Sequence, residues 1–451
     1  MDLTVTPPPC DTTGDKLSIS HFRTNGEILE DDEHGNGDYI TTVKYSHNGE
    51  LVAFGDKTGR IAVFRHSEKT GEYEDYVSFT SHEREFDCLK STSIEEAINS
   101  IEWLKRTGPN YNLLTANEKT VKLWRLTERT RAIAETDVEM RDPDEPITSA
   151  DLLSVPKIVD VSMQVEATPR RVYANAHGYH IQSVSVCADQ DMFLSADDLR
   201  INVWHHEITK ECFNVVDLKP PSLSQLREVI TSAEFSPTHG SLFAYATTSG
   251  NITLCDMREK AIKPNSKFYF AEPNFQIKDG FGDIVSCVGH IRFSHSGNYI
   301  AARDVFTVKL WDIRMTEQPS VVIPVHDALL DHIDEFYESE GMFDRFTTAW
   351  SPEDKSIATG TYSSLFKTFN AVDGSLTGTY EASVSQYLAK CRSSITRRKR
   401  RRSGQSKGPS VLAPGVPLDF DSKTLFMDWH PRSKFVAVAC TEKLFFFNEV
   451  L

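Results

Sequence analysis

The sequence predicts an all-β protein that folds as a seven-bladed β-propeller with a protruding hairpin insertion. Three observations predict this fold. Apolar residues alternate with polar ones in many short runs, the same order of runs and turns recurs along the chain, and the final copy lacks a strand. A chain of 451 residues could form several ordinary domains, but one closed ring uses the entire length.

Seven segments share the order strand, turn, strand, turn, strand. The first, ITTVKYSHNGELVAFGDKTGRIAVF, has the period-two alternation of half-buried strands and a His-Asn-Gly sequence at its first turn. The segments cover 40–64, 98–124, 181–204, 230–254, 291–311, 346–369 and 425–447.

The ends of the third strands indicate the type of propeller. The sequences VKLW at 121–124 and 308–311 and INVW at 201–204 resemble the terminal strand of WD repeats, where an aromatic residue packs between blades. Successive units lie 50–80 residues apart, whereas a bare WD-repeat blade takes about 40–45 residues. The sequence therefore predicts a WD-repeat propeller with additional loops in every unit.

The seventh unit stops at Leu451 after three strands, so another part of the chain must complete it. We assign this role to the segment around Leu17–Phe22, because a closed ring leaves no open sheet edge. The predicted organisation is an N-terminal segment over 1–38, partly disordered and containing the closing strand, followed by the propeller over 39–451.

One insertion is predicted inside the second unit. After Trp124 the alternation is interrupted and resumes at Val159, Val161, Met163 and Val165, which we interpret as a delayed fourth strand. Residues 127–158 then form a hairpin insertion between third and fourth strands, projecting from the face opposite the second-to-third turns. The alternative is a mobile acidic loop that binds no partner.

A second irregular stretch, 389–417, contains six consecutive basic residues at Arg397–Arg402 together with Gly, Ser and Pro. Its composition predicts a flexible basic loop. Four roles are open for it: a solvated loop without further function, a nuclear import signal, a regulatory segment that is phosphorylated, or a contact for an acidic partner.

Composition excludes several classes of function. The net charge of −16 argues against nucleic acid as a partner. No apolar run approaches the roughly 18 residues that cross a bilayer, and the N-terminus lacks the pattern of a secretory signal. We therefore expect a cytoplasmic protein without a membrane contact, with nuclear import as an open addition. The eight cysteines contain no CxxC pair, so we expect no zinc site, no disulfide framework and no cofactor.

The second-to-third turns should all emerge on one face of the ring. Their tips are Lys57, Glu118, Asp198, Ser249, Asp304, Tyr362 and Glu442, with Asp56 and Asp197 beside two of them. Carboxylates that converge around one opening would attract basic peptides. The alternative is that each acidic residue only satisfies the geometry of a tight turn.

Catalytic signatures are missing from the sequence. We find no GxxxxGK[ST] or HExxH motif, and Asp197 and Asp198 are neighbours in an extended chain, which points their side chains to opposite sides. The sequence therefore predicts a binding protein and not an enzyme, with no catalytic residues and no metal site.

Several long phrases resemble one family. EFDCLKSTSIEEAINSIEWL (85–104), NAHGYHIQSVSV (175–186) and SADDLRINVWHHEIT (195–209) are similar to the 55-kDa B family of protein phosphatase 2A regulatory subunits. The resemblance extends from about Tyr39 to Leu451. It implies a noncatalytic protein that joins the phosphatase 2A catalytic subunit to the HEAT-repeat scaffold subunit. It also implies recruitment of phosphoprotein substrates with basic flanks through an acidic groove on the top face.

The resemblance further implies which residues contact the substrate. Glu95, Glu96 and Asp198 would accept substrate Lys or Arg, and Phe86 would be an exposed aromatic contact, with a buried position between blades as the alternative. In similar proteins the hairpin at 127–158 grips the scaffold. The full set of expected substrate-binding residues is Lys57, Phe86, Glu95, Glu96, Tyr179, His180, Asp197, Asp198 and Leu226.

Some positions depart from the family pattern. Cys88 and Ala97 replace the usual Tyr and Lys near EFD and IEE, and Asn36 stands where an acidic residue is common, so the edge of the groove could select different substrates. Propeller geometry alone would equally allow a general WD-repeat adaptor, such as a ubiquitin-ligase receptor or a reader of histone tails.

Overall fold

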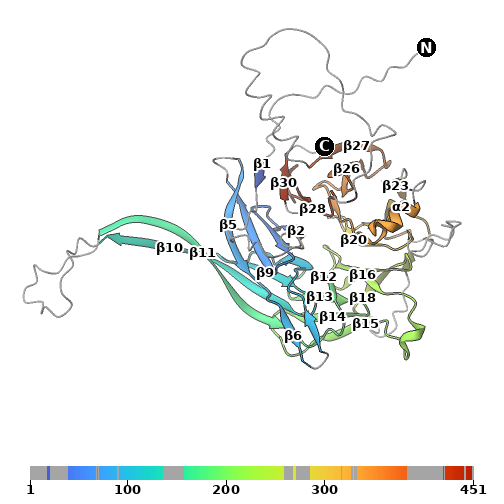
Figure 1. Ribbon diagram of the computed structural model, residues 1–451, viewed down its shortest axis with the longest axis horizontal. Coiled ribbons are helices and arrows are strands. Elements are labelled where there is room, and N and C mark those ends of the chain that lie inside the picture. The colour runs from blue at the N-terminus through green and yellow to red at the C-terminus, as the bar shows by residue number, and fades with distance from the viewer. Residues whose placement is uncertain are drawn as a thin grey trace, which may run out of the picture.

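The computed structural model describes a ring of antiparallel sheets (Figure 1). The described residues are 18–20, 39–67, 69, 71–88, 91–135, 157–258, 268–270, 285–315, 317–326, 329, 333–382, 420, 422–440 and 443–448. Within them, seven four-stranded sheets form the blades, and a small two-stranded sheet lies between the first two. The predicted all-β, seven-bladed propeller is confirmed.

In blades 1 to 6 the strands run from the central channel outwards in chain order, and in blade 7 the N-terminal strand takes the outer place. Blade 1 contains β2 (Ile40–Tyr45), β3 (Leu51–Asp56), β4 (Arg60–His66) and β5 (Tyr73–Thr80). Blade 2 contains β8 (Ser100–Trp103), β9 (Tyr111–Ala116), β10 (Val121–Glu135) and β11 (Lys157–Tyr173). Blade 3 contains β12 (Ile181–Val186), β13 (Met192–Asp197), β14 (Arg200–His205) and β15 (Phe213–Asp217). Blade 4 contains β16 (Ile230–Phe235), β17 (Leu242–Thr247), β18 (Ile252–Asp256) and β19 (Phe268–Phe270).

The later blades follow the same plan. Blade 5 contains β20 (His290–Phe293), β21 (Tyr299–Arg303), β22 (Thr307–Asp312) and β23 (Val321–Pro324). Blade 6 contains β24 (Thr348–Trp350), β25 (Ser356–Gly360), β26 (Leu365–Asn370) and β27 (Leu376–Glu381). Blade 7 contains β28 (Phe426–Trp429), β29 (Val436–Cys440), β30 (Lys443–Phe447) and β1 (Ser18–Ser20). Outside the blades lie β6 (Glu85–Asp87), β7 (Thr92–Ile94), a 3-10 turn η2 (Leu223–Gln225), the helix α2 (Ile333–Glu338) and a 3-10 turn η4 (Gly341–Phe343).

The N-terminal strand closes the ring. Strand β1 pairs antiparallel with β30, with Ile19 opposite Phe445, so the first and last described strands lie side by side (Figure 1). This is the place that the sequence analysis assigns to the segment around Leu17–Phe22. The pairing removes the open edge that β30 would otherwise present.

Apolar side chains from adjacent blades pack against each other. The interface of blades 1 and 2, for example, joins the fully buried Ile61 and Leu51 with Leu113 and Trp103. These residues occupy alternate positions of their strands, as period-two patterning requires. The core is therefore a series of layers between blades, and each blade depends on its neighbours.

Around the central channel, polar side chains of the inner strands bind the backbone of the next blade. Such bonds satisfy N–H groups that have no partner within their own sheet. Four of them are Val184 N to Ser100 Oγ at 3.2 Å, Phe235 N to Ser185 Oγ at 3.0 Å, Phe293 N to Glu234 Oε2 at 2.7 Å, and Tyr45 N to Asp428 Oδ2 at 2.8 Å.

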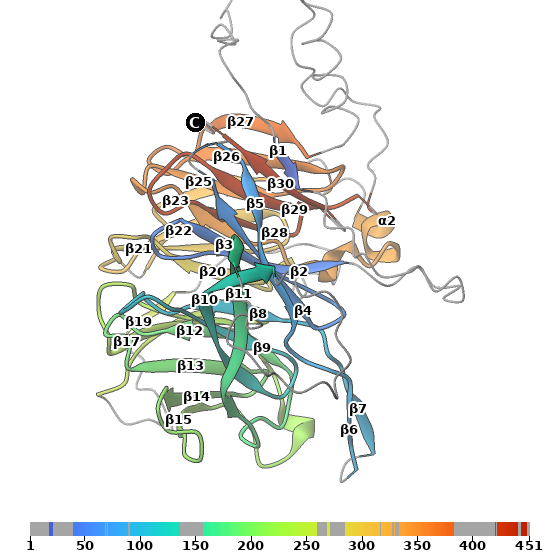
Figure 2. The same ribbon diagram turned by 90° about the vertical axis from the view of Figure 1, so that its left-hand side faces the viewer.

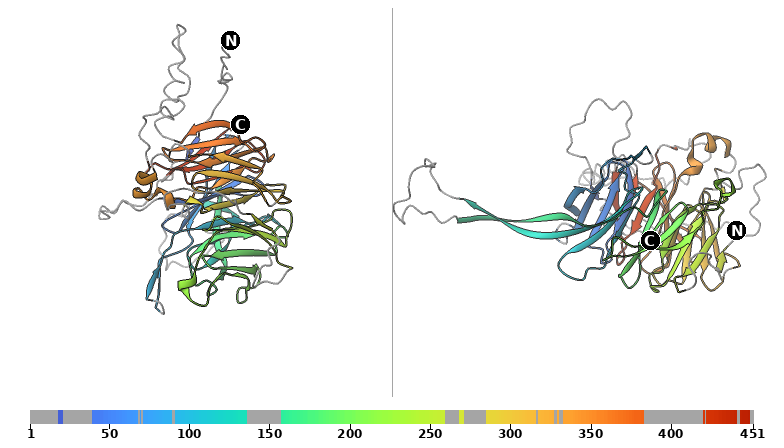
Figure 3. Two further views of the ribbon diagram at one scale, coloured as in Figure 1. Left: turned by 90° about the vertical axis from the view of Figure 1, so that its right-hand side faces the viewer. Right: turned by 90° about the horizontal axis from the view of Figure 1, so that it is seen from below.

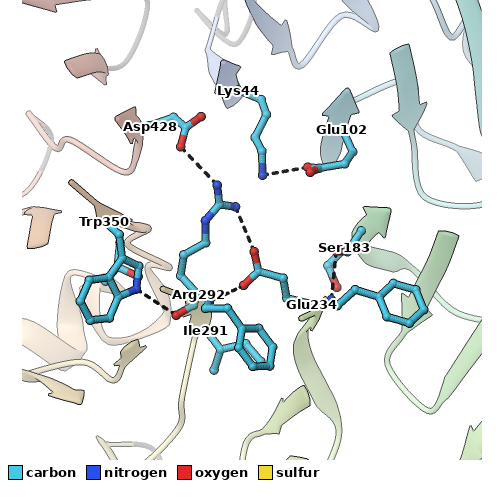
Figure 4. Close-up of polar contacts among 12 residues, drawn as sticks. Lys44, Glu102, Ser183, Glu234, Ile291, Arg292, Trp350 and Asp428 are labelled. Atoms are coloured by element: carbon cyan, nitrogen blue, oxygen red, sulfur yellow. Dashed lines mark hydrogen bonds and ion pairs between the residues drawn. The ribbon is translucent and has the colours of Figure 1, made fainter. Parts of the chain in front are cut away.

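Ion pairs cross the same channel (Figure 4). Lys44 Nζ lies 2.8 Å from Glu102 Oε2, and the guanidinium of Arg292 lies 3.4 Å from both Glu234 and Asp428. Asp428 thereby connects blade 7 to blade 5 through Arg292 and to blade 1 through its backbone contact. These bonds and ion pairs join the inner strands of the blades to one another around the channel.

The insertion in blade 2 is a long two-stranded ribbon that extends away from the ring (Figures 1 and 3). Strands β10 and β11 pair from Val121 opposite Tyr173 to Glu135 opposite Lys157, whereas β9 pairs with β10 only as far as Leu126. The arms leave the blade at the end opposite the β9–β10 turn. Residues 136–156 lie outside the described residues.

The predicted delayed fourth strand of blade 2 is present as β11, which contains residues 159–165, but it extends further along the chain than the prediction. Residues 159–165, interpreted from their alternation as that strand, belong to the protruding arm, and the blade uses residues 167–173 of the same strand β11. Alternation did not reveal the boundary because both parts are one continuous strand. The ribbon thus occupies about 127–166 and not 127–158.

Other predicted segments cannot be placed. The basic loop at 389–417 and all of 1–38 except Ser18–Ser20 lie outside the described residues. Among the described helices, none is long and apolar enough to cross a bilayer.

Candidate functional site

The second-to-third turns of blades 1, 2 and 3 follow one another along one rim of the ring. In each case the turn carbonyl accepts a hydrogen bond from the N–H group that begins the next blade. The three bonds are Ile98 N to Asp56 O at 3.1 Å, Ile181 N to Glu118 O at 2.9 Å, and Ile230 N to Asp198 O at 2.8 Å. This regular contact puts the turns of Lys57, Glu118 and Asp198 in neighbouring positions.

The segment before blade 2 joins the same rim. The backbone N–H of Glu95 lies 3.3 Å from Glu118 Oε2, and Asn117 Nδ2 donates to the carbonyl of Glu95 at 3.1 Å. Just upstream, β6 and β7 form a hairpin that emerges on the same side of the ring as α2 (Figure 2). Phe86 on β6 is 62% exposed, so the alternative of a buried phenylalanine between blades is wrong.

The buried side chain of Glu118 holds two neighbouring segments of this rim in place. It is 9% exposed, and its carboxylate contacts the backbone of Glu95 and lies 3.3 Å from His180 Nδ1. His180 itself is exposed and Tyr179 is half-buried. Glu118 therefore positions its neighbours, while His180 and Tyr179 remain accessible to a partner.

Asp197 is removed from the expected substrate contacts. Its side chain is 0% exposed and its carboxylate accepts from His177 Nδ1 at 3.0 Å and from the N–H groups of Leu199 and Arg200 at 2.8 and 2.7 Å. Burial alone would raise the pKa of Asp197, but the bonds from His177 and the two N–H groups outweigh burial and lower that pKa. Asp197 is a structural residue of the turn.

The histidine partner of Asp197 is itself fixed from the other side. His177 Nε2 lies 2.6 Å from Ser195 Oγ, which accepts a hydrogen bond from Trp204 Nε1 at 2.9 Å. A chain of four side chains thus ties the turn to the blade core. These contacts hold the backbone of the turn that carries Asp198 in a fixed conformation.

Asp198 has a different environment from its neighbour. It is half-buried, and its carboxylate accepts a hydrogen bond from Gln182 Nε2 at 2.9 Å. Gln182 in turn accepts from Arg345 Nη1 at 2.6 Å, so Arg345 reaches Gln182 from the opposite side of the channel mouth. Sequence analysis missed Gln182 and Arg345, because nothing local indicates a contact between residues 163 positions apart.

The remaining turns contribute less than their sequences suggest. Asp304 is 8% exposed and its carboxylate accepts from Phe306 N, Thr307 N and Thr307 Oγ1. Tyr362 is 2% exposed and donates to Gly341 O at 2.8 Å, while Ser249 donates to Glu228 at 2.6 Å. Glu442 lies outside the described residues. The expected convergence of four carboxylates from the turns is therefore wrong for Glu118, whose carboxylate contacts Glu95 and His180, and for Asp304, whose carboxylate serves its own turn.

Three carboxylates remain available on the rim, and we call Glu95, Glu96 and Asp198 the acidic arc. Glu95 is exposed, Glu96 and Asp198 are half-buried, and none forms an ion pair within the described part of the chain. Unpaired carboxylates on a protein rim attract cationic side chains and favour Arg or Lys as ligands.

Two expected residues flank the acidic arc. The Lys57 ammonium lies 5.6 Å from the centre of the Tyr39 ring, on the turn before blade 2. Leu226 is 37% exposed on the connection between β15 and β16, four residues before the Ile230 N–H that binds Asp198. Phe86 and Leu226 are the exposed large apolar residues among the expected contacts.

No group of three or more His, Cys, Asp or Glu residues in the described ranges could hold a metal ion. The geometry supports noncovalent recognition of a peptide.

Comparison with known proteins identifies relatives over nearly the whole chain. The serine/threonine-protein phosphatase 2A regulatory subunit sur-6 of Caenorhabditis elegans is 40% identical over 452 residues, which covers 97% of this chain and 91% of the relative. The protein phosphatase PP2A 55 kDa regulatory subunit of Drosophila melanogaster is 40% identical over 432 residues, covering 93% and 85%. No family model matches the chain.

A solved structure supports the fold alone. The β-propeller domain of Cps50 (Swd1) from Myceliophteria thermophila superposes with a TM-score of 0.53 over 96% of this chain and 100% of that chain, at 12% sequence identity.

Proposed function

Since the chain belongs to the 55-kDa regulatory subunits of protein phosphatase 2A, and is therefore a noncatalytic phosphatase regulator, we propose that it recruits phosphoprotein substrates with basic flanks. The observation that carries this proposal is the acidic arc, whose three carboxylates lack ion-pair partners in the described residues. Each can pair with a substrate Lys or Arg.

The proposed recognition combines charge with apolar anchors. Electrostatic attraction speeds encounter with a basic segment, and Phe86 and Leu226 offer apolar surface to side chains beside it. His180, with its neighbour Tyr179, is joined to Glu95 of the acidic arc through Glu118. Phosphate removal itself would be performed by the phosphatase catalytic subunit.

The second half of the proposal concerns assembly. The β10–β11 ribbon extends far from the blades and would bind the HEAT-repeat scaffold of the phosphatase, leaving the acidic arc free for substrate. Deleting residues 127–166 and rejoining the strands should abolish copurification with the scaffold and catalytic subunits. Recovery of ubiquitin-ligase components or histone tails in place of the phosphatase would reject the proposal in favour of a general adaptor.

Recognition can be tested with one charge reversal and a matched control. Asp198→Lys should weaken binding of an arginine-flanked phosphopeptide to the assembled holoenzyme by at least about tenfold, since paired interfacial charges are worth about 2–5 kcal/mol when desolvated and less at a rim. Glu317→Lys changes the net charge equally on the exposed β22–β23 connection, at the other end of the blades. Equal effects of the two variants would contradict a role for the acidic arc.

A further inference from the structure

The ribbon of blade 2 must hold its direction with few contacts. Beyond Leu126 and Tyr111, β9 no longer pairs with β10, and only β10 and β11 continue together. An isolated two-stranded ribbon is marginally stable in water and bends easily. The contacts at its base therefore decide the angle at which it leaves the propeller.

Blade 1 supplies a polar contact at this base. Glu128 Oε1, two residues beyond Leu126, accepts from Arg65 Nη1 at 2.9 Å and from the Tyr76 hydroxyl at 3.0 Å. The Arg65 guanidinium also lies 5.8 Å from the centre of the Tyr76 ring. Burial, followed by the hydrogen bond to Glu128, raises the pKa of Tyr76, so the hydroxyl stays a donor at physiological pH.

An apolar contact lies at the same level of the ribbon. Val165 is the cross-strand partner of Glu128, and Val165 and Ala167 pack against the apolar cluster between blades 1 and 2, as do Tyr76, Val77 and Phe79 of β5. Cross-strand partners project on the same side of a ribbon. One side of the ribbon thus rests on blade 1 through a carboxylate and two apolar side chains.

The next ion pair outwards has another role. Arg129 Nε lies 3.0 Å from Glu166 Oε2, but these residues connect the two arms to each other and are largely exposed. Arg129 and Glu166 therefore provide a control at nearly the same height that does not touch blade 1.

We propose that Glu128 is a positioning residue, which through Arg65 and Tyr76 sets the angle between the ribbon and the propeller. The angle determines where the acidic arc stands relative to whatever the ribbon binds. This inference rests on the proposed function in one respect, because it takes the HEAT-repeat scaffold as the partner of the ribbon.

The test compares Glu128→Ala with Glu166→Ala in the full-length chain. Glu128→Ala should accelerate hydrogen exchange in residues 127–130 and 163–166 and weaken binding to the scaffold–catalytic dimer by about tenfold, as expected for the loss of a half-exposed charged contact. Glu166→Ala should leave the binding within about twofold of wild type. Tyr76→Phe, which removes one hydroxyl but keeps the aromatic ring against the apolar cluster, should give an intermediate loss.

A charge swap separates positioning from general damage. Glu128→Arg combined with Arg65→Glu should restore slow exchange and most of the binding, whereas each single change should not. Wild-type exchange rates in Glu128→Ala would overturn the inference, and so would accelerated exchange with unchanged binding. If deletion of 127–166 also leaves assembly intact, the proposed docking role of the ribbon fails independently of the positioning role of Glu128.

Discussion

Arg345 Nη1 donates a hydrogen bond to Gln182 Oε1 at 2.6 Å and thereby connects the start of blade 6 to the inner strand of blade 3. Gln182 passes the contact to Asp198 through its amide at 2.9 Å. A positive charge from the far side of the ring thus stands two hydrogen bonds away from the acidic arc. The proposed binding of basic peptides at the acidic arc should therefore be weakened by this arginine.

Arg345→Gln should strengthen binding of an arginine-flanked phosphopeptide by about threefold at low ionic strength, because a charge that repels the peptide is removed. The gain should be smaller in high salt, because salt already screens the repulsion between Arg345 and the peptide. Fluorescence anisotropy over a salt series measures this. Arg314→Gln, on the exposed connection after β22, is the matched control. Unchanged or weaker binding in Arg345→Gln alone would refute the prediction.

Asp197 and Asp198 should separate stability from binding. Asp197→Ala leaves His177 and two N–H groups buried without their acceptor, which should lower the free energy of unfolding by about 2–4 kcal/mol. Asp198→Ala should change that free energy by less than about 1 kcal/mol and reduce peptide binding. Urea unfolding and peptide titration of both variants provide the comparison, and a reversal of the two patterns would contradict the assignment.

Acid should destabilise the propeller through buried His82. Its side chain is 1% exposed, and burial, together with the charge of Lys122, lowers the pKa of His82 to about 3. Below about pH 6.5 the unfolded chain binds a proton that the folded chain does not, so stability falls as the pH drops from about 6.5 towards 3. Between about pH 8 and pH 5 this histidine alone should cost about 2 kcal/mol.

The measurement for His82 is the free energy of urea unfolding as a function of pH. His82→Gln should flatten the curve between about pH 6.5 and pH 5, whereas the same change at exposed His239 should leave its shape unchanged. A curve of wild-type steepness in His82→Gln would show that other groups carry the acid sensitivity.

The closing strand can be tested by two nested deletions. Removal of residues 1–20 takes away β1 and exposes the edge of β30, which should lower the free energy of unfolding by about 2–3 kcal/mol through the loss of three paired positions. Removal of residues 1–15 keeps β1 and should have a much smaller effect. The melting temperatures of the two deletion variants test this prediction. Equal melting temperatures would show that β1 contributes nothing to closure of the ring.

Much of the architecture was predictable because it depends on local patterns. Period-two alternation identifies strands such as Ile40–Tyr45, and seven similar units with a missing final strand indicate one closed ring. The boundary of the ribbon was not predictable. Residues 159–165 alternate in the same way as 167–173, and only the end of pairing with β9 separates arm from blade.

The sequence by itself determined the number of blades, the need for a borrowed strand and the type of side chain at each turn, since all three follow from repeats and alternation along the chain. The tertiary structure alone decided which carboxylates are available. Asp197 is bound by His177, Glu118 supports its neighbours and Asp198 meets Gln182, because the folding of each blade against the segment before it brings together groups that lie about 16–23 positions apart. The availability of a carboxylate depends on burial and on partners in space, and distance along the chain carries no information about either.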